Sequence, residues 1–103
     1  MRELFRRRPE IESAPLDREC ILYSPGANKF LHLNSTASFV WSRIGEPATA
    51  ESVAGDLAGS FEGVQRSDAL RDVESLLREM VSLSVVEILP DHGADGPIER
   101  EKG

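Results

Sequence analysis

The chain has 103 residues, of which 40% are hydrophobic, and 18 Asp and Glu residues outnumber 12 Lys and Arg residues. A chain of this length buries about two-thirds of its unfolded surface, which supports one small two-layered core and excludes a catalytic cleft between two domains. Its single cysteine, Cys20, excludes an intramolecular disulfide and a multi-cysteine metal site, so we expect a reducing, cytoplasmic location. No run of residues approaches the roughly 18 uncharged apolar positions of a membrane helix, so we expect no membrane insertion.

Charge is distributed unevenly along the chain. Residues 1–8 contain four arginines and one glutamate, a local charge of +3, so the rest of the chain carries −9. Because nucleic-acid affinity comes mainly from neutralisation of phosphates by Lys and Arg, an acidic body disfavours DNA binding. We interpret residues 1–8 as a flexible basic arm, which could still contact a nucleic acid or an acidic protein patch.

Turn residues divide the first third of the chain into pieces of strand length. Apolar pieces at residues 19–23 and 29–33 flank a Pro-Gly-Ala-Asn segment, which is typical of a hairpin loop. We expect a further strand around residues 10–13. These three pieces predict an antiparallel meander.

Apolar residues at a spacing of 3.6 predict three helices after this meander. The first follows candidate N-caps at residues 34–36 and ends near Gly45, and the second is capped by Thr49. The third has the clearest apolar stripe, formed by Leu70, Val73, Leu77 and Met80. A mostly β-branched apolar patch, Val85, Val86, Ile88 and Leu89, predicts a short terminal strand. Residues 90–103 are mainly Gly, Pro and charged residues and predict a disordered tail.

The side chains available for catalysis are few. His32 and His92 are the only histidines, so a two-histidine metal site on a rigid frame is not expected, and no glycine-rich phosphate loop is present. Cys20 and His32, on neighbouring strands, could form a thiolate pair, although a lone cysteine in an apolar strand is usually a small buried hydrophobe. We therefore predict no catalytic residues, no metal, no cofactor and no enzymatic activity.

The segment 29–41, KFLHLNSTASFVW, resembles the hallmark of the PqqD-like family. In that family a strand ending in Leu-Asn runs into a helix that opens with Thr-Ala and closes on Ile/Val-Trp. The resemblance covers about residues 9–88, with one departure at Ser84, where the family usually has a C-capping glycine. Further matching positions are Gly45, Thr49, Ala50, Val53, Leu57, Phe61, Asp72, Val73, Leu76, Leu77, Met80, Val85 and Val86.

The resemblance implies an α+β, winged-helix-like domain over residues 9–89, with a three-stranded antiparallel sheet followed by three helices. It also implies a non-catalytic module that recognises the leader segment of a ribosomally made, post-translationally modified peptide (RiPP). Such a module presents the leader to a modifying enzyme, which would be a radical-SAM enzyme, a protease or a cyclase. Independently, a short sheet with a free edge can accept a peptide as an added strand, and the meander order places residues 29–33 at an edge.

The resemblance places the leader between this edge strand and the third helix. Leu31 and Leu33 share one face of the strand; if that face is buried, Phe30 and His32 flank the groove or a partner. Trp41 is expected as a core anchor, with groove lining as the alternative. We predict Asp72 as a polar clamp, and Leu83 could extend the helical wall. The predicted peptide-binding residues are Lys29, Phe30, Leu31, His32, Leu33, Ala69, Asp72, Val73 and Leu76.

Two other classes of function compete with leader-peptide recognition. In a winged-helix DNA-binding regulator the third helix would read DNA, but Arg66, Arg71 and Arg78 are offset there by four carboxylates. A small enzyme is disfavoured by the lack of catalytic side chains. The prediction is therefore a leader-peptide binder that contacts neither nucleic acid nor membrane.

Overall fold

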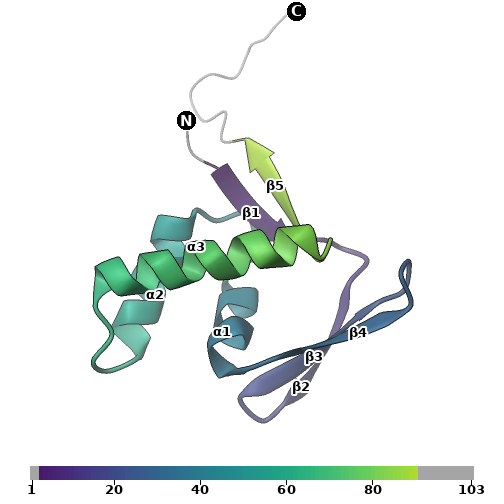
Figure 1. Cartoon of the computed structure of the whole chain (residues 1–103), viewed down its shortest axis with the longest axis horizontal. Helices are drawn as coiled ribbons and strands as arrows, with labels where there is room; N and C mark the ends of the chain where they lie inside the picture. The colour runs from purple at the N-terminus through teal and green to yellow at the C-terminus, as the bar shows by residue number, and fades with distance from the viewer. Residues whose placement is uncertain (1–2, 91–103) are drawn as a thin grey trace, which may run out of the picture.

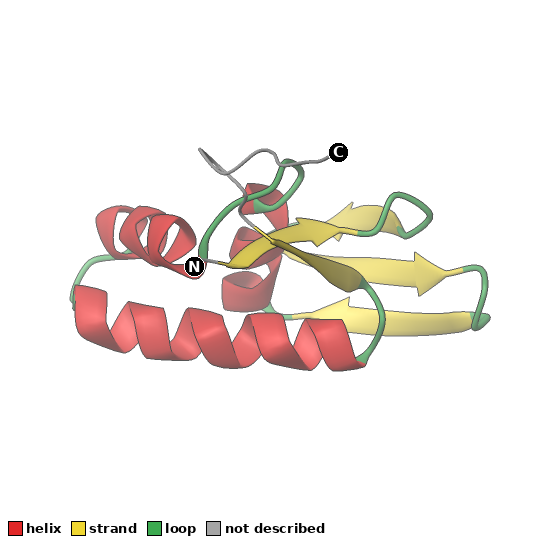
Figure 2. Ribbon diagram, turned by 90° about the horizontal axis from the view of Figure 1, so that it is seen from above, coloured by secondary structure: helices red, strands yellow, loops and turns green. Residues whose placement is uncertain are grey.

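Five strands and three helices follow one another in the computed structural model of the chain, which describes residues 3–90 (Figure 1). The strands form two sheets, one of three strands and one of two. Seen from above, the helices gather toward one side of the molecule and the strands toward the other (Figure 2). The elements are β1 (Glu3–Arg7), β2 (Glu12–Leu16), β3 (Glu19–Ser24), β4 (Lys29–Leu33), α1 (Ser35–Arg43), α2 (Ala50–Ser60), α3 (Arg66–Ser82) and β5 (Val86–Pro90).

The three-stranded sheet is the predicted antiparallel meander, in the order β2-β3-β4. Its register pairs Leu22 with Leu31 and Cys20 with Leu33, so alternate residues of β3 and β4 face the core. The strand expected around residues 10–13 lies slightly later, at Glu12–Leu16, and contains Pro15. An edge strand tolerates a proline because the missing N–H can face away from the neighbouring strand.

The loop between β3 and β4 has the turn geometry expected from its sequence. Asn28 has a φ of 53°, in the left-handed region that asparagine tolerates better than most residues. Its amide donates to the carbonyl of Pro25 at 3.3 Å, and its side-chain oxygen accepts from the hydroxyl of Tyr23 at 3.1 Å. These bonds close the hairpin and fix the start of β4.

Side-chain caps fix where two of the helices begin. Asn34 Oδ1 accepts from the amide of Ala37 at 2.9 Å, and Thr49 Oγ1 accepts from the amide of Ser52 at 3.1 Å. Because Asn34 directly follows β4, the edge strand passes into α1 without an intervening loop. The two predicted cap sites are confirmed.

The C-terminus of α3 ends in a Schellman motif with a serine at the position that favours glycine. Ser84 has a φ of 64°, its amide donates to the carbonyl of Val81 at 3.0 Å, and the amide of Val85 donates to the carbonyl of Met80 at 3.1 Å. Ser84 replaces the C-capping glycine that the family usually has. The replacement places a residue with a Cβ in the left-handed region, which glycine occupies without strain.

The core lies between the inner face of the three-stranded sheet and the three helices. Trp41 is 3% exposed, which confirms its assignment as a core anchor. Val73, Leu77 and Met80 of the α3 stripe are also buried, while Leu70 is partly buried. The largest fully buried side chains are Leu22, Val40, Ile44, Val53, Val73, Leu77 and Val86.

The expectation of a flexible arm over residues 1–8 is wrong for residues 3–7, which form β1. This strand pairs antiparallel with β5, with Glu3 opposite Pro90 and Arg7 opposite Val86 (Figure 1). Phe5 is 3% exposed and exchanges two backbone hydrogen bonds with Ala48, at 2.8 and 3.0 Å. β1 is therefore ordered by the burial of Phe5 and by backbone pairing with a distant strand, although its arginine-rich composition predicted a flexible arm.

The arginines of β1 are held by specific neighbours. Arg6 forms an ion pair with Glu87 of β5, and the guanidinium of Arg7 lies 5.1 Å from the centroid of the Trp41 ring. The predicted terminal strand is confirmed as β5. The predicted tail lies outside the described residues from position 91 onward, as does His92, whereas Pro90 belongs to β5.

Candidate functional site

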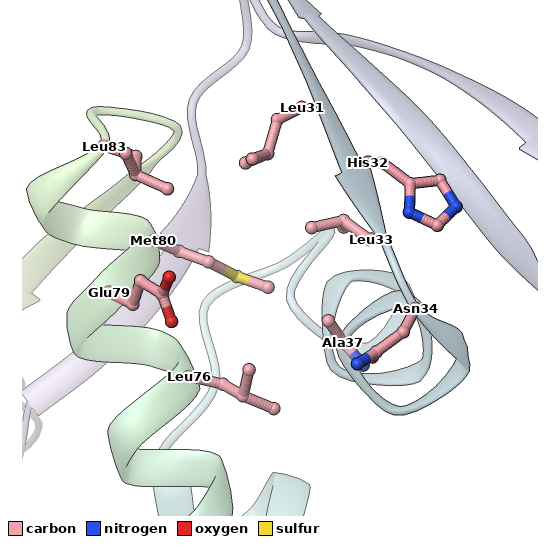
Figure 3. Close-up of a pocket in the computed structure, with 9 residues that line it drawn as sticks. All are labelled: Leu31, His32, Leu33, Asn34, Ala37, Leu76, Glu79, Met80 and Leu83. Carbon is pink, nitrogen blue, oxygen red and sulfur yellow. The ribbon is translucent and has the colours of Figure 1, made fainter.

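A hollow of about 150 Å³ lies between the edge strand β4 and the C-terminal half of α3 (Figure 3). The side chains of Leu31 and Leu33 approach it from β4, and those of Leu76, Met80 and Leu83 approach it from α3 and its C-cap. The complete lining is Leu31, His32, Leu33, Asn34, Ala37, Leu76, Glu79, Met80 and Leu83.

The spacing of these residues follows from their elements. On α3 and its C-cap, Leu76, Glu79, Met80 and Leu83 stand at i, i+3, i+4 and i+7, which places them on one helical face. On β4, the period of two turns Leu31 and Leu33 inward. The helix and the strand thus each contribute one apolar row, and the hollow lies between the rows.

A second hollow, of about 130 Å³, continues along β4 toward the hairpin loop. Leu31 and Leu83 line both hollows, so the two are neighbours. We call them together the β4–α3 groove. The second hollow is lined by Leu22, Ser24, Ala27, Lys29, Phe30, Leu31, Leu83 and Val85.

The main chain of β4 faces this groove along an open sheet edge. Within residues 3–90, β3 is the one strand that pairs with β4. In an antiparallel ladder, alternate residues direct their N–H and C=O groups toward the partner strand and away from it. Pro15, opposite Cys20, has no N–H and is expected to face away from β3, and the alternation then directs Phe30 and His32 toward the open edge.

The side chains of Phe30 and His32 lie on the outer face of the sheet. Phe30 is 73% exposed, and its ring centroid lies 4.8 Å from that of Tyr23. The ring of His32 points away from the groove (Figure 3), and its Nε2 lies 2.7 Å from Glu19 Oε1. These two residues therefore border the groove through their backbone.

The alternative of a Cys20–His32 thiolate pair is wrong. The two side chains lie on opposite faces of the sheet, since Cys20 is buried and His32 is exposed. The thiol of Cys20 instead lies 3.5 Å from the hydroxyl of Ser38 in α1. The structure thus supports the packing role for this cysteine.

The structure brings together part of the predicted peptide-binding set. Leu31, His32, Leu33 and Leu76 line the first hollow, and Lys29 and Phe30 line the second. Glu79 and Met80 line the first hollow without having been predicted, although their spacing from Leu76 is a signal that could have found them.

Three predicted residues on α3 lie elsewhere. Ala69 and Val73 are 0% exposed, so the prediction that they contact a peptide is wrong. Asp72 is exposed but lines neither hollow. The physical reason is the position of α2, which packs against α3 and lies beside its N-terminal half (Figure 1).

A metal site and a membrane-spanning helix are both absent from the described residues. Within residues 3–90, no group of three or more His, Cys, Asp and Glu side chains is arranged to hold a metal ion. In the same part of the chain, no helix combines the length and the apolar character that crossing a membrane requires.

The chain is similar to two proteins of known structure. One, described as lasso peptide synthetase B1 complexed with the leader peptide, is 31% identical, with a TM-score of 0.67 and coverage of 84% of this chain and 98% of that chain. The other, TbiB1 in complex with the TbiA(beta) leader peptide, is 19% identical, with a TM-score of 0.72 and coverage of 91% and 99%. No curated protein matches the chain.

These likenesses confirm the predicted fold class, an α+β, winged-helix-like domain in which a three-stranded antiparallel sheet precedes three helices. The β1–β5 pair is an addition to that expectation. The family model described as coenzyme PQQ synthesis protein D (PqqD) matches residues 19–86, which is more than half of the chain. The chain therefore belongs to the PqqD family.

Proposed function

We propose that this protein recognises the leader segment of a ribosomally made, modified peptide by adding it as a strand to β4. The observation that carries the proposal is the coincidence of an open strand edge with an apolar groove beside it. Both similar structures are described as complexes with leader peptides, which supports the same function here.

The backbone and the side chains of the groove contribute to peptide affinity in different ways. The outward N–H and C=O groups of Phe30 and His32 supply hydrogen bonds that depend little on sequence, each contributing about 0.5–1.5 kcal/mol net. Apolar leader side chains that enter the two hollows add about 25 cal/mol for each Å² buried. Ordering a flexible peptide opposes both terms. We therefore assign peptide binding to Lys29, Phe30, Leu31, His32, Leu33 and Leu76, together with Met80 and Leu83.

We also propose that the protein is not itself an enzyme and hands the leader to a separate modifying enzyme. A radical-SAM enzyme, a protease and a cyclase are the candidate partners. The description of the 31% identical protein as a lasso peptide synthetase component favours a partner that matures such a peptide. The protein would act where the peptide is synthesised, in the cytoplasm.

The competing function, DNA reading by α3, is less well supported. Arg71 Nη2 lies 3.6 Å from Asp68 Oδ1, and Arg78 Nη2 lies 3.9 Å from Glu3 Oε1. Because these cations already have carboxylate neighbours, α3 offers little net positive charge to phosphates. Tight, sequence-selective binding of duplex DNA at physiological salt would reverse this ranking.

The test is a titration of the isotope-labelled protein with the leader peptide of the precursor encoded beside it. The amide resonances of β4 should shift most, because a new ladder changes their hydrogen bonds. His32→Pro removes an outward donor and should abolish binding, whereas His32→Ala removes only a side chain that points away and should bind normally. The spectrum of each variant reports its folding. Largest shifts in α2, or equal binding by both variants, would contradict strand addition on β4.

A further inference from the structure

The β4–α3 groove contains a single carboxylate, that of Glu79. Glu79 is exposed, and Figure 3 shows its carboxylate beside Met80, at the edge of α3 that faces β4. Its neighbours on the same wall, Leu76, Met80 and Leu83, are apolar. A negative charge therefore stands at the centre of an otherwise apolar helical wall.

Among residues 3–90, no ion pair within 4.0 Å includes this carboxylate, and the one Lys or Arg that lines the groove, Lys29, lines the second hollow and not the first. The positions one turn before and after Glu79 on α3 are Ser75, Leu76, Ser82 and Leu83, and none is basic. Across the groove, the ring of His32 turns away toward Glu19. The charge of Glu79 is thus available to a ligand.

A peptide laid along β4 would cover Glu79 and remove water from it. Covering a carboxylate with apolar or acidic side chains is unfavourable, because the charge loses hydration without gaining a partner. A Lys or Arg side chain at that point supplies a charge-assisted hydrogen bond instead. The same residue would therefore favour basic peptides and reject neutral or acidic ones.

We propose that Glu79 makes the groove selective for leader segments that carry a Lys or Arg beside their apolar anchors. This inference rests on the proposed function and narrows it to a class of peptide. Since groove-facing residues of an added strand alternate, the basic residue should stand two positions from an apolar one. The apolar residue enters a hollow, and the basic residue pairs with Glu79.

The test uses a displayed library of random peptides long enough to pair with all of β4. Wild-type protein should enrich peptides in which an apolar residue and a Lys or Arg are two positions apart. Glu79→Gln should still enrich the apolar residue but lose the preference for the basic one. Glu74→Gln, a matched change at an exposed residue of α3 that lines neither hollow, should keep both preferences.

Calorimetry on one enriched peptide then measures the pairing directly. Changing its basic residue to Gln should weaken binding to wild type about fivefold, at the upper end of the range for exposed ion pairs and below the range for charged hydrogen bonds. The same change should have little effect with Glu79→Gln, and Glu79→Lys should prefer the peptide with Glu at that position. Raising the salt concentration should reduce the wild-type preference.

The possible failures are distinguishable. Enrichment of apolar residues without any preference for a basic one would overturn the role of Glu79 and leave strand addition standing. No enrichment above a protein-free control would overturn the proposed function and this inference with it.

Discussion

Ser84→Gly should make the protein more stable. Ser84 occupies the left-handed region with a φ of 64°, where the Cβ of an L-residue costs roughly 1–2 kcal/mol. Glycine removes that penalty but gains about 0.4–1 kcal/mol of chain entropy in the unfolded state. The hydroxyl of Ser84 makes no hydrogen bond within residues 3–90, so its loss removes no contact there. The expected net gain is about 0.5–1 kcal/mol.

Urea and thermal unfolding measure this change. The urea midpoint should rise at an unchanged m-value, and the melting temperature should rise by about 2–8 °C, as expected for a domain of this size. The matched control is Ser75→Gly, an exposed position inside α3, where glycine should destabilise by about 0.5 kcal/mol. If Ser84→Gly is no more stable than wild type, the left-handed backbone at residue 84 does not limit stability.

Three further predictions concern the core, β1 and the helical wall. Leu77 is 0% exposed, so Leu77→Ala should lower the free energy of unfolding by about 2–5 kcal/mol, as measured by urea unfolding. Calorimetry on the folded variant should show unchanged peptide affinity, because Leu77 affects binding only through folding. Phe5→Ala should lower stability by about 3 kcal/mol in the same assay, because Phe5 is buried; a silent change would restore the frayed-arm interpretation. Asp72→Asn should leave leader affinity within about twofold of wild type, since this residue lines neither hollow, and a larger loss in calorimetry would return Asp72 to the site.

The strand–helix junction at Asn34 was predictable because its signals are local. The change of hydrophobic period from two to 3.6 occurs at a residue that caps a helix, and both signals lie within a few residues of each other. β4 and the start of α1 are accordingly found where the sequence places them.

β1 was not predicted, because the contacts that stabilise this strand are distant in the sequence. Its partner strand begins at Val86, and the decisive contacts of Phe5 are with Ala48 and β5, which are distant in the chain. Two apolar residues among arginines carry no local strand signal strong enough to reveal such pairing.

The error on α3 concerns position along the helix axis. Asp72, Leu76 and Glu79 share nearly one face, and helical periodicity identified that face. Asp72 and Glu79 are, however, about 10.5 Å apart along the axis, at 1.5 Å for each residue. Periodicity cannot distinguish the half of α3 beside α2 from the half beside β4, because that choice is made by tertiary packing.

The pairing of β1 with β5 also has a consequence for the order of folding. β1 is among the first of the described segments to be synthesised, but its ladder requires Val86–Pro90, the last of them. Until β5 has left the ribosome, β1 has no partner strand, and the side chain of Phe5 can pack only against the parts of the fold that have already been synthesised. A nascent chain stalled before residue 86 would therefore expose the apolar and arginine-rich β1, and chaperones or proteases would meet that segment first.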